Sequence, residues 1–584
     1  MLELMAKLST VAKAALQGEF GDHPALVSDL SIGRATKREF GDVQISAAMA
    51  LGKKLGRPPR DLAALMLKSV AADELVARAE VAGPGFVNVW FKDQVIVDAA
   101  TSLELRPIGR GQTVVIDYSS PNVAKPMHIG HIRSTIIGEA LKRVLRALSY
   151  QVIADNHLGD WGTQFGKLIV AYKRWLDTDA FAKAPVEELL RIYIKYTQEE
   201  KREAGEEIAE DEATKSAPPI LQEARRELVK LQAGDAKNVA LWKTFIEVSM
   251  AEFARIYARL DVSFDVTLGE SFYNDRLAAT VALLQEKGIA VESEGAIAVF
   301  FSKERDGEEL PPFLVRKGDG GFNYGTSDVA AVLYRVEHWS AGRILIVVDE
   351  RQQLHFKQLF ATARRLGVTA SLEHVWFGLM RLPEGVIRTR DGEGLIYLDD
   401  FLDEAERRAE KVATEHNPAL SETERREVAR VVGLGAVRYN DLSKDRRTMI
   451  TFTWDKALSL TGNTAPYLQY AYARMRSILR KASAEDYAPG PIAREVLSPV
   501  ERDLLTRLLW YPDAVEQVAR TACPHILCDY LFDLASAMST FYAEHPVLKA
   551  EPEIRSSRLT LIDRVAQVLS DGLGLLGIGV LERM

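Results

Sequence analysis

The chain has 584 residues, of which 47% are hydrophobic and 27% charged, and its formal net charge is −8. This length allows three or four domains, and the composition is that of an ordinary globular protein rather than a disordered one. No apolar run approaches the roughly 20 residues of a membrane span, and the N-terminus lacks the apolar region of a secretory signal, so we expect a cytoplasmic protein.

The two cysteines, Cys523 and Cys528, exclude a disulfide framework. They also cannot form a cysteine-rich zinc site without other ligands. Both fall in an apolar stretch with a helical pattern, so we expect core thiols and predict no metal site.

The negative charge does not exclude RNA, because it is unevenly distributed. Residues 1–110 carry 14 Lys and Arg against 13 Asp and Glu, and residues 451–584 carry 14 against 16. Much of the excess lies in the middle, notably in E-E-K-R-E-A-G-E-E-I-A-E-D-E-A at 199–213. RNA would therefore have to be bound by local basic patches and aromatic stacking.

Residues 1–110 are predicted to form a small α+β domain. The pattern around 62–70 predicts a helix, and G-P-G-F-V-N-V-W-F at 83–91 predicts a turn followed by a strand. Aromatic residues in that strand include core positions, so packing is one explanation for Phe86.

The most informative stretch runs from Asp117 to Tyr150. The β-branched run at 113–116 predicts a buried strand, and apolar residues recur at helical spacing from 131 to 148. Between them lie Pro121 and Pro126, which cannot occupy a central strand. A strand, a tight loop and a helix start leave backbone N–H groups that can bind an anion.

His128, Gly130 and His131 occupy this turn, and Lys125 lies just before it. Gly130 leaves room for a close ligand. The histidines can donate hydrogen bonds to a phosphate that gains charge in a transition state. A nucleotide site therefore explains the turn better than two isolated histidines do.

A second strand at 152–154 leads into N-H-L-G-D-W-G-T-Q-F-G at 156–166. We expect this glycine-rich loop at the carboxyl edge of a parallel sheet, where ligands bind in open α/β folds. Asp160 is expected to orient its neighbours. Residues 171–300 are predicted to be largely helical and to interrupt the fold, which is expected to resume near 296–301.

Tyr324 and Asp328 are four residues apart at the opening of a helical pattern, which places them on one face. A carboxylate is a natural partner for a guanidinium, and a tyrosine hydroxyl can accept another hydrogen bond. The alternative is an acidic residue favoured only by the helix dipole. The strand at 344–348 should bring Gln352 and His355 to the same carboxyl edge.

After about residue 450 the pattern is almost entirely helical. Tyr467, Tyr470 and Arg474 follow one another at i, i+3 and i+7, which places them on one helical stripe. A tyrosine stripe is more often part of a core. With an arginine on the same face, it also suits single-stranded bases that stack on aromatic rings and guanidinium planes.

Several motifs together resemble the arginyl-tRNA synthetases of class I. H-I-G-H at 128–131 is the signature of the class, although some nucleotidyltransferases carry a similar motif. Four longer stretches resemble the arginyl family itself, over nearly the whole chain: S-S-P-N-V-A-K-P-M-H-I-G-H-I-R-S-T-I-I-G, N-H-L-G-D-W-G-T-Q-F-G, T-A-P-Y-L-Q-Y-A-Y-A-R and L-L-G-I-G-V-L-E-R-M.

The resemblance implies a multidomain α/β protein with a Rossmann-like catalytic domain, an N-terminal α+β domain and an all-helical C-terminal bundle. Residues 1–110 would bind the tRNA elbow at the D-loop. The catalytic domain would span 111–400, with a connective insertion at 171–300. A helical connector would follow at 401–450, and the anticodon-binding bundle would span 451–584.

The resemblance also implies ATP-dependent ligation of L-arginine to tRNA(Arg) through an arginyl-adenylate. ATP would enter with Mg²⁺, and we expect no tightly bound cofactor, no membrane partner and a monomer. The implied catalytic residues are Lys125, His128, Gly130 and His131. The implied arginine-binding residues are Tyr324 and Asp328 at the guanidinium, and Asp117, Asn122 and Gln352 at the α-ammonium and carboxylate end. The implied tRNA-binding residues are Phe86, Asn88, Tyr467, Tyr470, Arg474, Tyr542 and Met584.

One departure concerns the mobile K-M-S-K loop of class I synthetases, whose second lysine neutralises the ATP phosphates. The equivalent stretch, I-R-T-R-D-G-E-G-L-I-Y-L-D-D at 387–400, contains no lysine. Arg388 and Arg390 keep positive charge there, and Gly392 keeps mobility. Arginyl enzymes often carry a lysine just ahead of H-I-G-H instead, which is Lys125 here, and one cation can replace another near the same phosphates.

Two alternatives stay open. A nucleotidyltransferase could use the same histidine motif on a small substrate, but this leaves the N-terminal and helical domains unexplained. A non-catalytic relative that only carries tRNA would be consistent with the degenerate loop, although H-I-G-H and the arginine-site residues are intact.

Overall fold

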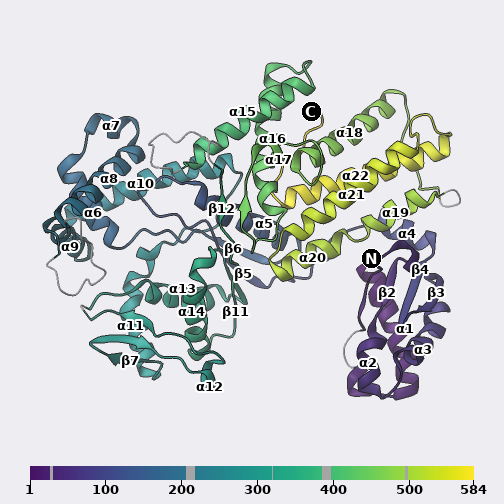
Figure 1. The fold of residues 1–584 in the computed structure, drawn as a ribbon, viewed down its shortest axis with the longest axis horizontal. Helices are drawn as coiled ribbons and strands as arrows, with labels where there is room; N and C mark the ends of the chain where they lie inside the picture. Colours follow the sequence, from purple (N-terminus) through teal and green to yellow (C-terminus); the bar gives the residue numbers. More distant parts are fainter. Residues whose placement is uncertain (27–29, 205–216, 319, 384–395, 494–496) are drawn as a thin grey trace. The chain divides into compact units, whose positions relative to one another are not determined.

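The computed structural model describes residues 1–26, 30–204, 217–318, 320–383, 396–493 and 497–584 (Figure 1). Its contacts divide the chain into two compact units. The terminal unit consists of Met1–Arg106, Leu460–Gly574 and Gly579–Met584, and the central unit of Pro107–Ser459 and Leu575–Ile578. Within the described ranges, no helix is long and apolar enough to cross a membrane.

A parallel sheet of four strands organises the central unit (Figure 1). Its strand order is β11 (Ser371–His374), β10 (Arg343–Ile346), β5 (Thr113–Asp117) and β6 (Gln151–Asp155). The chain passes from β5 to β6 on one side, and β10 and β11 lie on the other side of β5. The direction of winding therefore changes between β5 and β10, and open α/β sheets bind ligands at the carboxyl edge beside such a point.

The strand register aligns the carboxyl ends of these strands. Asp117, the last residue of β5, pairs with Asp155 on β6 and with Ile346 on β10, and Ile346 pairs with His374 on β11. Two aspartates thus end neighbouring strands at this edge.

Helix α5 (Ile132–Ala147) connects β5 to β6 and confirms the predicted helix after the H-I-G-H turn. All eight apolar positions of the predicted stripe are buried: Ile132, Ile136, Ile137, Ala140, Leu141, Val144, Leu145 and Leu148. The helix also buries Arg133, whose Nε lies 2.9 Å from a carboxylate oxygen of Asp441. A buried pair of this kind satisfies both charges, which an apolar pattern alone does not reveal.

The predicted helical insertion is present. It contains α6 (Thr163–Trp175), α7 (Thr178–Lys183), α8 (Pro185–Ala204), α9 (Pro219–Gln232), α10 (Ala236–Arg259) and α11 (Asn274–Glu286). Most of the acidic segment 199–213 lies outside the described residues.

The expectation that the parallel fold resumes near Ala296 is wrong. Strand β8 (Ala296–Val299) instead pairs antiparallel with β7 (Ala290–Ser293) and β9 (Phe313–Arg316) in a separate sheet. Glu294 and Gly295 both have positive φ, 53° and 79°, and link β7 to β8 as a two-residue turn. Such turns produce tight antiparallel hairpins, so the parallel sheet resumes only at β10.

The rest of the central unit is mainly helical. It comprises α12 (Lys303–Asp306), α13 (Tyr324–Trp339), α14 (Gln353–Arg365), α15 (Leu398–His416), α16 (Glu422–Leu442) and α17 (Trp454–Ala457). Two short strands, β12 (Met380–Arg381) and β13 (Ile450–Thr451), pair in parallel. The antiparallel pair α15 and α16 occupies the predicted helical connector.

The terminal unit contains the predicted N-terminal α+β fold and C-terminal helices. Its antiparallel sheet has the order β1 (Ile32–Arg34), β2 (Val43–Ile45), β4 (Phe86–Phe91) and β3 (Val76–Ala82), accompanied by α1 (Leu2–Phe20), α2 (Ala47–Leu55), α3 (Pro59–Ala71) and α4 (Asp93–Thr101). The C-terminal helices are α18 (Ala465–Ala484), α19 (Pro499–Leu508), α20 (Tyr511–Thr521), α21 (His525–Glu544) and α22 (Pro552–Leu575). Arg502 of α19 connects the two parts, because it binds Asp42 at 2.8 Å and Asp93 at 2.6 Å.

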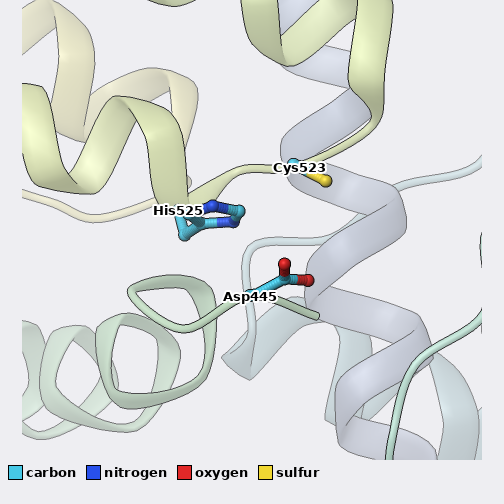
Figure 2. A group of neighbouring side chains, drawn as sticks. All are labelled: Asp445, Cys523 and His525. Atoms are coloured by element: carbon cyan, nitrogen blue, oxygen red, sulfur yellow. The ribbon is translucent and has the colours of Figure 1, made fainter. Parts of the chain in front are cut away.

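Both cysteines of the terminal unit are buried thiols, as expected. Cys528 lies in α21, whereas Cys523 lies in the link that precedes this helix. Figure 2 shows Cys523 and His525 at this turn; Asp445, also drawn there, belongs to the central unit.

Candidate active site

The H-I-G-H turn forms one turn of 3-10 helix, Ile129–His131, directly before α5. The backbone N–H of Gly130 donates to Nδ1 of His128 at 3.0 Å, and the N–H of His128 donates to Nδ1 of His131 at 3.1 Å. The two ring centroids lie 4.2 Å apart. A Cβ on Gly130 would lie 2.7 Å from the His128 ring, so a larger residue here would displace that ring.

The surroundings of both histidines favour their neutral forms. Burial, followed by the charge of His128, lowers the pKa of His131 to about 4. Burial, followed by the charge of Lys125, lowers the pKa of His128 below its usual range. Because Nδ1 of His128 accepts a hydrogen bond, its neutral ring carries the proton on Nε2, which can then donate to an anion.

Lys125 is placed by a sharp backbone turn and by the helical insertion. Ala124 has a φ of 63°, and its N–H donates to Oγ of Ser249 in α10 at 2.8 Å. Nζ of Lys125 lies 4.9 Å from the centre of the Tyr193 ring in α8. Burial, followed by the charge of Lys167, lowers the pKa of Lys125. Among the described residues, no carboxylate lies within 4.0 Å of this nitrogen, so a bound anion would supply the missing negative charge.

Asp117 is held by an arginine of the chain itself. Arg335 is buried in α13 and donates from Nη2 to Asp117 at 2.6 Å and to Asp155 at 2.8 Å. The other oxygen of Asp117 accepts a hydrogen bond from Oγ of Ser120 at 2.9 Å. Two carboxylates thus share the one guanidinium, and this arrangement suits a further cation such as an ammonium group.

Asn122 and Gln352 are both exposed at this edge. Asn122 forms a parallel bridge with Gly159, and a Cβ on Gly159 would lie 2.1 Å from Oδ1 of Asn122. The glycine of N-H-L-G-D therefore makes room for the Asn122 side chain. Gln352 ends the short helical turn Glu350–Gln352 that follows β10.

The start of α13 brings Tyr324 and Asp328 to the edge where β10 ends. Oδ2 of Asp328 lies 2.6 Å from Nε2 of His355, a residue in the first turn of α14. Tyr324 is 62% exposed, and its ring centroid lies 4.9 Å from that of His355. The Asp328 side chain is 27% exposed and can therefore reach a ligand.

A further carboxylate, Glu270, was not anticipated from the sequence. Burial raises the pKa of Glu270 to about 7, and the charges of Asp328 and Asp160 add to this rise. Asp160 accepts hydrogen bonds from the backbone and hydroxyl of Ser271, at 2.8 and 2.5 Å, and so fixes the turn that carries Glu270. This agrees with the expectation that Asp160 orients its neighbours. Two carboxylates that repel each other form a favourable site for a ligand cation.

The degenerate loop residues Arg388, Arg390 and Gly392 lie outside the described residues. The C-terminal flank of this loop is described and pairs with the H-I-G-H turn. The N–H of Ile129 donates to the Ile396 carbonyl at 3.0 Å, and the N–H of Leu398 donates to the Met127 carbonyl at 2.9 Å.

Comparisons with known proteins agree with this geometry. The family model described as "tRNA synthetases class I (R), catalytic domain" matches residues 97–454. Two others match residues 6–91, "Arginyl tRNA synthetase N terminal domain", and residues 468–584, "DALR anticodon binding domain". The chain belongs to the arginyl-tRNA synthetase family.

Relatives in this family match over nearly their whole length. The arginine–tRNA ligase of Fusobacterium nucleatum is 43% identical, with 94% of each chain covered, and that of Cellvibrio japonicus is 42% identical, with 98% of each covered. Among solved structures, Thermus thermophilus arginyl-tRNA synthetase matches with 26% identity, a TM-score of 0.84 and complete coverage of both chains. The Plasmodium falciparum enzyme matches with 25% identity and a TM-score of 0.82, covering 100% of this chain and 99% of its own.

The predicted elbow contacts of this arginyl-tRNA synthetase family member lie on β4. Phe86 is half-buried at the start of the strand, and Asn88 is 1% exposed. Nε2 of Gln44 donates to Oδ1 of Asn88 at 2.7 Å. The Asn88 side chain is thus buried and bonded within the domain, and its contact with tRNA stays a prediction.

The predicted anticodon contacts gather around α18. Tyr470 is 48% exposed, and the Arg474 guanidinium lies 4.2 Å from the centre of the Tyr542 ring. The Tyr467 hydroxyl lies 3.3 Å from Oγ of Ser539. Tyr467 therefore packs against α21, and its contact with tRNA stays a prediction.

The C-terminal segment is anchored to the same helix. Glu582 accepts hydrogen bonds from Arg476 at 2.9 Å, from Arg480 at 2.8 Å and from Tyr472 at 3.3 Å. These contacts hold the segment that ends at Met584 on α18, where we predicted a tRNA contact.

Proposed function

We propose that the protein ligates L-arginine to tRNA(Arg) in two steps, with ATP entering as its magnesium complex. The main support is the arrangement at one sheet edge. Two neutral histidines follow β5, and Asp328 is held by a residue that follows β10. Groups suited to phosphates and a group suited to a guanidinium thus lie beside the point where the winding of the sheet changes.

In the first step, the arginine carboxylate attacks the α-phosphate of ATP in line. A bond forms between the carboxylate oxygen and phosphorus, the bond to the bridging oxygen breaks, and pyrophosphate leaves. Nε2–H of His128, together with His131 and Lys125, stabilises the charge that develops on the phosphate oxygens. Donors fixed before the reaction stabilise the transition state without reorganisation.

Arginine is oriented by charge. The guanidinium binds Asp328, with Glu270 and the Tyr324 hydroxyl beside it. The α-ammonium and carboxylate end binds at Asp117, Asn122 and Gln352. A site built for a guanidinium rejects shorter or neutral side chains, because they would leave its carboxylates without a cation.

In the second step, the 2′-hydroxyl of the terminal adenosine of tRNA attacks the carbonyl carbon, and AMP leaves. The proposed tRNA contacts are Phe86, Asn88, Tyr467, Tyr470, Arg474, Tyr542 and Met584. We assign residues 1–110 to the elbow and 451–584 to the anticodon. We also propose that the enzyme acts as a monomer in the cytoplasm, where translation takes place.

Arginine-dependent exchange of pyrophosphate into ATP, measured with and without tRNA(Arg), tests this function. Exchange and tRNA charging are expected with arginine and not with lysine. A nucleotidyltransferase would exchange pyrophosphate without arginine. A protein that only carries tRNA would bind it and show no exchange.

A further inference from the structure

We infer that His355 is a positioning residue of the arginine site and that it fixes the plane of the Asp328 carboxylate before arginine binds. This inference rests on the proposed guanidinium site. It assigns His355 to the orientation of a carboxylate rather than to packing or to contact with phosphate.

The contact between the two side chains is short and sheltered. Nε2 of His355 lies 2.6 Å from Oδ2 of Asp328, and the two side chains are 10% and 27% exposed. A carboxylate only accepts hydrogen bonds, so Nε2 must carry the hydrogen whether the ring is neutral or charged. Asp328 therefore selects the tautomer of His355, and His355 in turn occupies one lone pair of Asp328.

The His355 ring does not depend on Asp328 for its own orientation. Its centroid lies 5.6 Å from that of Phe313 on β9, 5.1 Å from Phe356 on α14 and 4.9 Å from Tyr324 on α13. The ring is thus packed between aromatic residues of three elements, and its Nε2–H points from a fixed location.

The physical need for such a residue comes from the shape of the ligand. The terminal torsion of an aspartate is broad, so an unsupported carboxylate rotates about its last bond. A guanidinium is planar and binds a carboxylate through two parallel hydrogen bonds, which requires the two planes to align. His355 donates to one oxygen of Asp328 from the protein side. The remaining lone pairs of the carboxylate stay available for the two hydrogen bonds of a guanidinium.

His355→Phe keeps an aromatic ring and removes the donor. We expect KM for arginine to rise about ten- to hundredfold, as for the loss of a hydrogen bond to a charged group. The KM for ATP and kcat should change by less than about threefold, since adenylate formation does not use this residue. His355→Gln retains an N–H donor and should recover most of the arginine affinity.

His374→Phe is the matched control. His374 also packs against Phe356, with ring centroids 4.5 Å apart, but it lies 3.2 Å from the Val348 carbonyl instead of a carboxylate. It should leave KM for arginine unchanged. An equal rise in this variant would show that packing around Phe356, and not the donor, controls arginine binding, and would overturn the inference.

A double-mutant cycle with Asp328→Asn separates this inference from the proposed site. If His355 acts through Asp328, the double variant Asp328→Asn, His355→Phe should bind arginine no more weakly than Asp328→Asn alone. Additive losses overturn the inference. An Asp328→Asn variant with normal KM for arginine refutes the guanidinium site itself. If KM for arginine rises in Asp328→Asn but is normal in His355→Phe, the guanidinium site is supported and only the role of His355 is refuted. If His355→Phe does not fold, the His355→Gln and His355→Asn pair decides, because Asn keeps the amide but is too short to reach; equal KM values in the two would refute the role.

Discussion

Replacing Lys125 with alanine should slow adenylate formation by about a hundred- to a thousandfold. Nζ of Lys125 lies over the Tyr193 ring, and burial together with Lys167 lowers its pKa. A unit charge about 4 Å from a phosphate oxygen contributes about 4 kcal/mol at an effective dielectric constant near 20. Part of this interaction already exists with bound ATP, and the part that grows as pyrophosphate leaves sets kcat. Losses of about 2.7–4 kcal/mol follow the removal of one fixed donor in comparable sites.

The assay is single-turnover formation of arginyl-adenylate at saturating arginine and ATP. The KM for arginine should remain close to that of the parent, because Lys125 is assigned to phosphates. Lys195→Ala provides a matched control, since Nζ of Lys195 lies over the Trp175 ring at 5.2 Å in a similar arrangement. It should retain the parental rate.

Arg388→Ala and Arg390→Ala complete the comparison. If Lys125 replaces the cation that the degenerate loop lacks, both loop variants should be faster than Lys125→Ala. If Lys125→Ala forms adenylate as fast as the parent and Arg390→Ala forms it slowly, the loop and not Lys125 supplies the cation for the phosphates. This result would refute the reasoning.

Three further predictions concern the ligands. Asp328→Asn should raise KM for arginine at least about thirtyfold, equivalent to about 2 kcal/mol, with KM for ATP unchanged; a normal arginine KM would remove Asp328 from the site. Burial raises the pKa of Glu270 to about 7, and a bound guanidinium favours its ionised form. KM for arginine should therefore fall as pH rises from about 6 to about 8, and Glu270→Gln should flatten this profile, whereas an unchanged slope would exclude Glu270. Tyr470→Ala should raise KM for tRNA(Arg) about 5- to 150-fold, equivalent to about 1–3 kcal/mol of base stacking, without changing exchange or the melting temperature. A loss of melting temperature alone would favour a packing role for the stripe.

The H-I-G-H turn and α5 could be predicted because their signals are local. The prolines and glycine mark the loop, and every apolar position of the helical period that follows is buried. The same kind of local reasoning expected the interrupted fold to resume near Ala296, where the chain instead forms an antiparallel hairpin. The deciding feature was the Glu294–Gly295 turn, whose positive φ angles commit β7 and β8 to an antiparallel hairpin.

The residues that organise the arginine site could not be predicted in this way. Glu270 acquires its raised pKa from burial and from Asp160 and Asp328, which come from other parts of the chain. Arg335 donates a hydrogen bond to Asp117, from which it is separated by 218 positions in the sequence. No periodicity encodes such contacts. The one available signal was the G-E-S-F-Y segment, where an acidic residue stands among aromatic ones.

The pairing of Arg335 also explains how arginine is oriented in the proposed complex. Asp117 and Asp155 already share the buried guanidinium of Arg335. Neither carboxylate at the end of β5 therefore has both oxygens available to bind a second guanidinium through two hydrogen bonds. Two carboxylates with a single guanidinium between them still suit a compact ammonium group. Asp328, which is partly exposed and bonded on one oxygen to His355, keeps the outer lone pairs that a planar fork requires. We therefore propose that arginine binds with its guanidinium toward α13 and α14 and its ammonium toward β5.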